Sequence, residues 1–95
     1  MIILGYYNKK VGFYMPPFFD NRDAKTVARD QYRAILMNTK KAKENHFEEL
    51  NLVQFGVFDD ISGKFELFAT PQLVLDCQDV LFKAQEAELA QKGEE

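Results

Sequence analysis

A row of basic residues at helical spacing is the clearest sign of chemistry in this sequence. Its members are Arg22, Lys25, Arg29 and Arg33. Steps of three, four and four residues place side chains along one face of an α-helix, and such a row of cations can follow the phosphates of a nucleic-acid backbone. Two other interpretations stay open: a solvated helix face partly neutralised by Asp23 and Asp30, or a docking surface for the acidic second half of the chain.

More cations and two tyrosines lie near the row in the sequence. They are Lys9, Lys10, Lys40, Lys41, Lys43, Tyr7 and Tyr14. The first two lysines fall in a predicted hairpin turn, and the other three extend positive charge beyond the predicted helix. The tyrosines lie on predicted strands, where their rings can stack on unpaired bases. We expect the row, the hairpin lysines, Lys40 and the two tyrosines to form one nucleic-acid site.

The sign of the charge changes along the chain. Residues 1–43 hold nine Lys or Arg and three acids, whereas residues 44–95 hold three Lys and twelve acids, which gives the overall net charge of −3. A basic half beside an acidic half is typical of a polyanion-binding face, of a self-complementary dimer, or of an acidic segment that competes for the basic face. Scattered solvated charge is the fourth interpretation.

The residue types that catalysis needs are scarce. The chain has one serine, one histidine and one cysteine, which are Ser62, His46 and Cys77. Ser62 falls in a predicted turn and His46 in a charged connection, so no nucleophile and base are predicted to meet. Asp59 and Asp60 complete neither a calcium loop nor an acid–base pair, no zinc-ligand spacing occurs, and the glycines are isolated. We expect a protein that is not an enzyme and that uses no cofactor or metal.

The sequence begins with a predicted β-hairpin. Residues 2–7 and 11–15 are rich in β-branched and aromatic side chains, with a short polar turn between them. Two prolines, Pro16 and Pro17, end the second strand because neither can donate to a strand ladder. The next two residues, Phe18 and Phe19, are expected to plug the core.

A helix is predicted next, over residues 23–38. Apolar residues recur at helical spacing from Ala24, and Asp20 or Asn21 is the expected N-cap. Residues 40–49 are polar and charged, so they are either an exposed connection or a helical extension.

The second half predicts another hairpin and another helix. Residues 50–58 and 64–69 alternate as strands around a turn at residues 59–63, and Phe55 is expected to be fully buried. Thr70 and Pro71 look like an N-cap followed by proline at the first helical position. The helix is therefore expected to begin at Pro71 or Asp76 and to end near Gln91.

This element order, ββαββα, predicts an α+β fold with a four-stranded, mostly antiparallel sheet and helices on one face. We expect one domain over residues 1–92 and an acidic tail over residues 93–95. The strands carry more aromatic rings than two helices can cover, and the sheet has edges to protect. A homodimer or higher oligomer is the expected state, with the uncovered sheet face as an interface.

No membrane association is expected from the sequence. The longest apolar stretch, Met1 to Tyr7, is far shorter than the roughly 20 residues of a membrane span, and no basic segment precedes it. The single cysteine suits a reducing compartment. We expect the chain to stay in the cytoplasm.

Two parts of the sequence carry a resemblance to a known family. They are residues 5–10, 16–19 and 23–29 in the first half, and residues 49–60 and 62–64 with Pro71 in the second. These strand and turn patterns resemble the small nonstructural protein of gokushoviruses, tailless single-stranded-DNA phages of the microvirus group. The resemblance covers residues 2–75 and identifies no active site. The segment 76–95 is longer and more acidic than is usual in that family.

The resemblance implies a phage protein associated with viral DNA replication in the host bacterial cytoplasm, described as binding single-stranded DNA or acting in DNA synthesis. It carries over Arg29 by pattern, while Arg22, Lys25 and Arg33 rest on spacing alone. The first hypothesis is therefore a single-stranded-DNA-binding protein. The second is an interaction module that engages a replication or host protein through its sheet face and its acidic C-terminal helix.

Overall fold

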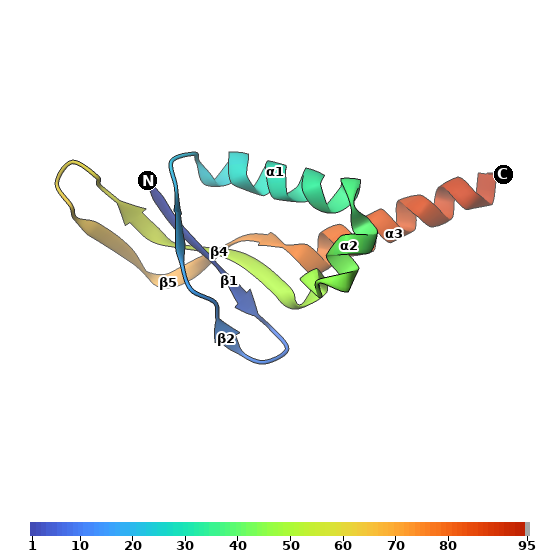
Figure 1. Cartoon of the computed structure of the whole chain (residues 1–95), viewed down its shortest axis with the longest axis horizontal. Helices are drawn as coiled ribbons and strands as arrows, with labels where there is room; N and C mark the ends of the chain where they lie inside the picture. The colour runs from blue at the N-terminus through green and yellow to red at the C-terminus, as the bar shows by residue number, and fades with distance from the viewer. Residues whose placement is uncertain (95) are drawn as a thin grey trace.

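The fold is an α+β arrangement of an antiparallel sheet with helices on one face, as predicted (Figure 1). The computed structural model describes residues 1–94, with side chains described to Leu89. The strands are β1 (Ile2–Asn8), β2 (Phe13–Tyr14), β3 (Phe18–Asp20), β4 (Leu50–Phe58) and β5 (Phe65–Asp76). The helices are α1 (Ala24–Met37), α2 (Thr39–Glu44), the short 3-10 helix η1 (Phe47–Glu49) and α3 (Cys77–Glu94).

The sheet has five strands rather than the predicted four. Its order is β2-β1-β4-β5, and β3 also pairs with β1, so β2 and β3 share one edge of β1. The connection between β2 and β3 contains Pro16 and Pro17, which cannot donate to a ladder. Strand pairing with β1 resumes after the prolines, at Phe18 and Phe19. The expectation that these two residues plug the core is wrong, because both are exposed.

The boundaries of α1 match the prediction, but its cap does not. The carboxylate of Asp23 accepts a hydrogen bond from the Thr26 backbone N–H at 2.7 Å, which makes Asp23 the N-cap. Asp20 instead accepts from the backbone and side chain of Arg22. The charged segment after α1 forms α2 and η1, so the interpretation as a helical extension is the correct one.

The strand β5 is twice as long as expected and includes Thr70 and Pro71. Between the pairs Gly56–Leu67 and Gln54–Gln72, one residue of β4, Phe55, faces four residues of β5. Such a bulge leaves backbone groups out of the ladder, so a proline is tolerated there. The predicted helix start at Pro71 is wrong, and the helix begins at Cys77, where the Asp76 carboxylate accepts from the Gln78 N–H at 3.0 Å.

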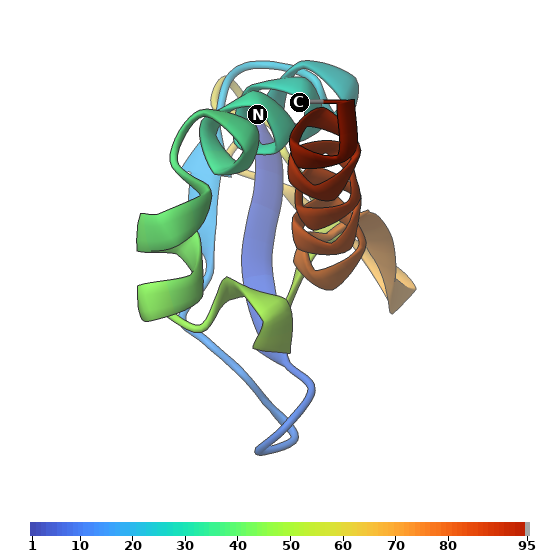
Figure 2. The same ribbon diagram turned by 90° about the vertical axis from the view of Figure 1, so that its right-hand side faces the viewer.

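The core lies between the sheet and the helices. Near the start of β1, Leu4 and Leu52 pack against Val27 of α1. Farther along, residues of α1, α2, β4 and α3 form a second cluster: Ile35, Ala42, Leu50, Cys77, Val80 and Leu81. Only the first part of α3 takes part in this cluster. The remainder of α3 projects from the body in Figure 1 and points toward the viewer in Figure 2. The expected tail begins inside this helix, which reaches Glu94, while residue 95 lies outside the described part.

Phe55 is only half-buried, so the expectation of full burial is wrong. Leu52 and Gln54 face α1, so alternation along β4 places the Phe55 ring on the opposite face of the sheet, over Gly5. A Cβ at Gly5 would lie 2.6 Å from the Phe55 ring. Glycine at this position therefore makes room for the ring.

Candidate functional site

The outer face of α1 carries three exposed cations without an ion-pair partner among the described side chains. They are Lys25, Arg29 and Arg33. At the helix start, hydrogen bonds from Thr26 lower the pKa of Asp23, and the positive charges of Arg29 and Lys25 add to this effect. Lys40, at the start of α2, is exposed as well. We call these four residues the basic face.

Arg22 does not belong to this face, although its spacing predicted it. Its guanidinium binds the carboxylate of Asp20 at 2.8 Å and also contacts the Asp30 carboxylate. Hydrogen bonds from Arg22 lower the pKa of Asp20 to about 2. Because two acids already hold it, Arg22 is a structural link between β3 and α1 rather than a free cation.

The hairpin lysines are also engaged. Lys9 Nζ lies 3.0 Å from Asp76 Oδ1 and 3.1 Å from Gln78 Oε1, which joins the β1–β2 turn to the start of α3. Lys10 is more exposed, and its Nζ lies 3.6 Å from Glu49 Oε1. Neither lysine is brought next to the basic face.

The two tyrosines lie on the opposite side of the sheet from α1. Leu4 packs beneath α1, and side chains alternate along a strand, so Tyr7 points to the other face. Tyr14 pairs with Tyr7 in register, with ring centroids 4.7 Å apart. The basic face and the tyrosines therefore cannot form the single surface that the sequence suggested.

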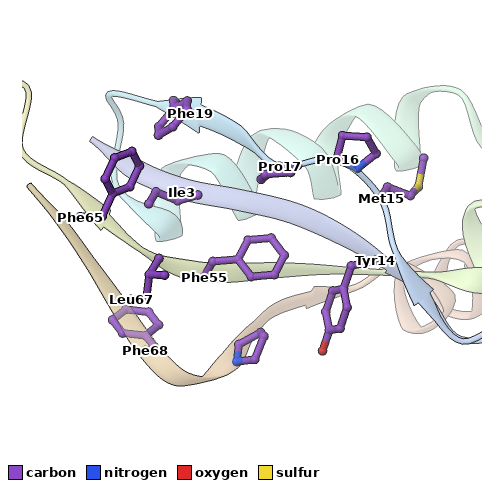
Figure 3. A pocket seen from close by; sticks show the side chains of 11 residues that line it. Ile3, Tyr14, Met15, Pro16, Pro17, Phe19, Phe55, Phe65, Leu67 and Phe68 are labelled. Carbon is purple, nitrogen blue, oxygen red and sulfur yellow. The ribbon is translucent and has the colours of Figure 1, made fainter. Parts of the chain in front are cut away.

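The tyrosine side of the sheet contains an apolar groove with a volume of about 630 Å³. Ile3 and Phe55 form its floor, and Tyr14 to Pro17 and Phe19 line one wall (Figure 3). The other wall is lined by Phe65, Leu67, Phe68 and Pro71. No charged side chain lines it. At one end, the rings of Phe19, Phe58 and Phe65 form a cluster with centroids 4.7–6.3 Å apart.

Sequence reasoning predicted an uncovered aromatic sheet face but missed the residues that shape the groove. Pro16 and Pro17 were interpreted only as the end of a strand, and Pro71 only as the first position of a helix. The signal for Leu67 was present, since its alternation with Phe65 placed both on one face. The position of Phe55 in the groove was missed because no local signal shows which face of β4 the helices cover.

One cluster has the residue types of a metal site. Ligand atoms of His46, Glu48 and Glu49 lie within 4.8 Å of one another. Glu49 already contacts Asn8 at 3.4 Å and Lys10. His46 is exposed, and Glu48 is half-buried with its Oε1 3.7 Å from His46 Nδ1. These contacts describe a charged surface turn, and sequence spacing did not single it out.

The thiol of Cys77 is held in its neutral form. Burial, with a contribution from the Asp76 carboxylate, raises the Cys77 pKa from 9.0 to about 11, and burial likewise raises the pKa of Tyr6 to about 12. Both groups are neutral below these values, so the stability they contribute is complete below about pH 9 and is lost as the pH rises through 11 to 12.

We expect Cys77 to react slowly with a thiol reagent in the native protein. At pH 9, about half of the thiol is ionised in the unfolded chain and about one hundredth in the fold. The native rate should therefore be at least about fifty times lower than the rate in urea, which serves as the control. Equal rates in the two states would show that Cys77 lies outside the core.

These features define a small α+β domain with a basic helical face on one side and an apolar groove on the other. No described helix is long and apolar enough to cross a membrane. The chain belongs to the phage ORF5 protein family, whose model matches residues 1–80. Comparison with curated proteins found no match, and comparison with solved structures found none either. The protein is thus a phage protein. The match to the family model extends from β1 into the first turn of α3.

Proposed function

We propose that this phage protein acts in viral genome replication in the host cytoplasm by binding single-stranded DNA without catalysing a reaction. The observation that supports the proposal is the basic face: three cations on α1 and one on α2 are exposed, and no ion pair with a described side chain engages them. Exposed cations of this kind bind phosphates and release counterions.

The proposed site is smaller than the sequence predicted. It consists of Lys25, Arg29, Arg33 and Lys40. The first and last of the three cations on α1 lie eight positions apart, which is about 12 Å along the helix. They can therefore contact successive phosphates of one strand. Arg22 and Lys9 are left out because acids already hold them, and the tyrosines are left out because they face away.

The preference for single strands is supported by the resemblance of residues 2–75 to the gokushovirus nonstructural protein, and we infer that the chain belongs to a phage of that kind. The geometry of the basic face favours phosphates in general. Duplex DNA is therefore the necessary comparison ligand.

The test is a titration of the whole chain with a labelled oligothymidine and with a duplex of equal length, at about 50 and 200 mM salt. Each phosphate contact contributes about −0.7 to the slope of log affinity against log salt for single strands, so four contacts predict a slope of roughly −3. Tighter binding to the single strand is expected. Undetectable binding at the lower salt would refute the proposal.

An interaction module is the second candidate function, and the apolar groove is the observation that favours it. A charge-free groove of this size fits apolar protein side chains better than a polyanion. The exposed acids of α3, Glu86 and Glu88, would then contribute to contact with a replication or host protein. Retention of such a partner by a chain that binds no oligonucleotide would favour this function over the first.

A further inference from the structure

We infer that the groove face of the sheet is the contact surface between two copies of this chain. The apolar area that this face exposes is large enough for an interface. Five large apolar side chains on this face are between 39% and 68% exposed: Tyr14, Met15, Phe19, Phe65 and Leu67. At about 200 Å² for each fully exposed side chain, they alone leave roughly 500 Å² of apolar surface open.

That area is at the upper end of what monomers leave exposed, which is about 300–600 Å². The exposed prolines 16 and 17 and the half-buried rings beside them enlarge the patch. The whole face thus approaches the roughly 800 Å² that each partner buries in a stable interface.

The absence of charge from the groove lining also favours contact with a second copy. The protein has a net charge of −3, yet its groove face has no charged lining residue. In a two-fold dimer, the same patch meets itself, so a charge near the axis would face the like charge of its copy, and a charge elsewhere in the patch would be buried without a partner. A charge-free patch avoids this repulsion, whereas a nucleic acid would require cations that this face does not offer.

The elongated shape of the chain leaves the groove face without cover of its own. The radius of gyration is 15.5 Å, whereas a compact chain of this length would give about 12 Å. The β4–β5 hairpin and α3 project in opposite directions in Figure 1, and β5 is a twelve-residue edge strand. A second copy over the groove would cover the exposed side of this hairpin, which has few contacts of its own with the helices.

With a two-fold axis perpendicular to the long direction of the groove, the Phe65 end of one copy would lie against the Tyr14 end of the other. The helices lie on the far side of each sheet, so the two basic faces would point outward. Pairing through the groove therefore leaves both basic faces accessible.

The test compares Leu67→Glu with Leu89→Glu. These leucines have nearly equal exposure, 68% and 69%, but Leu67 lies in the groove and Leu89 on the projecting part of α3. Sedimentation at tens of micromolar should give twice the 11.0 kDa chain mass for the parent and for Leu89→Glu. Leu67→Glu should raise the dimer dissociation constant at least about a hundredfold, because each interface would bury two carboxylates, and should be monomeric.

The parent alone provides a second measurement that does not depend on a variant folding. In a mixture of isotope-labelled and unlabelled copies, nuclear Overhauser contacts between copies should join Tyr14, Phe55 and Leu67. A monomeric parent would overturn the inference, as would a dimeric Leu67→Glu variant with a native circular-dichroism spectrum. So would a dimer whose contacts between copies lie on α3, or a groove occupied by oligonucleotide bases or a different protein.

Discussion

Replacing both Arg29 and Arg33 with glutamate is expected to abolish measurable single-stranded-DNA binding while leaving the fold intact. Both side chains are exposed on α1 and form no ion pair with a described side chain. Loss of two of four phosphate contacts should bring the salt slope from roughly −3 to about −1.5. The two new carboxylates then repel the strand, so the remaining contacts at Lys25 and Lys40 should not hold it.

A matched control is the pair Lys64→Glu and Lys83→Glu. Both lysines are exposed, Lys64 at the β4–β5 turn and Lys83 on α3, and the pair changes the net charge by the same amount. If binding depends on the basic face, the control should retain most of the affinity. Equal losses in the two double variants would show that only the overall charge matters, and an unaffected Arg29/Arg33 variant would remove α1 from the site.

The sequence predicted correctly those helices and strands whose limits are set by neighbouring residues in the chain. Strand β4 has the predicted limits because its flanking turn is specified by its own residues: Asp59 Oδ1 accepts from the Ile61 N–H at 3.0 Å, and Gly63 has a positive φ of 75°. Of the two predicted starts of α3, Asp76 lies one residue before the observed start at Cys77, whereas Pro71 is wrong because pairing to β4 continues to Asp76. That pairing depends on residues about twenty positions away.

Only the part of the candidate site that depends on local helical spacing could be predicted from the sequence. Helical spacing correctly places Lys25, Arg29 and Arg33 on one exposed face of α1. Spacing cannot show which cations find an acid in the fold: Lys9 meets Asp76, 67 positions away. Nor can it show that Tyr7 faces away from α1, because the side of the sheet that the helices cover is a tertiary property.

The buried side of the sheet should tolerate truncation far less well than the groove side. Leu52 is 0% exposed and packs with Leu4 and Val27 beneath α1. Leu52→Ala is expected to cost about 2–5 kcal/mol in the free energy of unfolding, since it leaves a cavity. For a domain of this size, each kcal/mol lowers Tm by about 4–8 °C, so thermal denaturation should show a decrease of at least about 8 °C.

Phe55→Ala is the matched comparison on the opposite face. Full truncation of a buried phenylalanine costs about 3–5 kcal/mol, but Phe55 is half-buried against Gly5 and Tyr14, so about half of that loss is expected. Both changes should be measured in the Leu67→Glu background, because pairing of copies over Phe55 would make its loss depend on protein concentration. If Phe55→Ala destabilises this background more than Leu52→Ala does, the core lies on the groove side of the sheet instead.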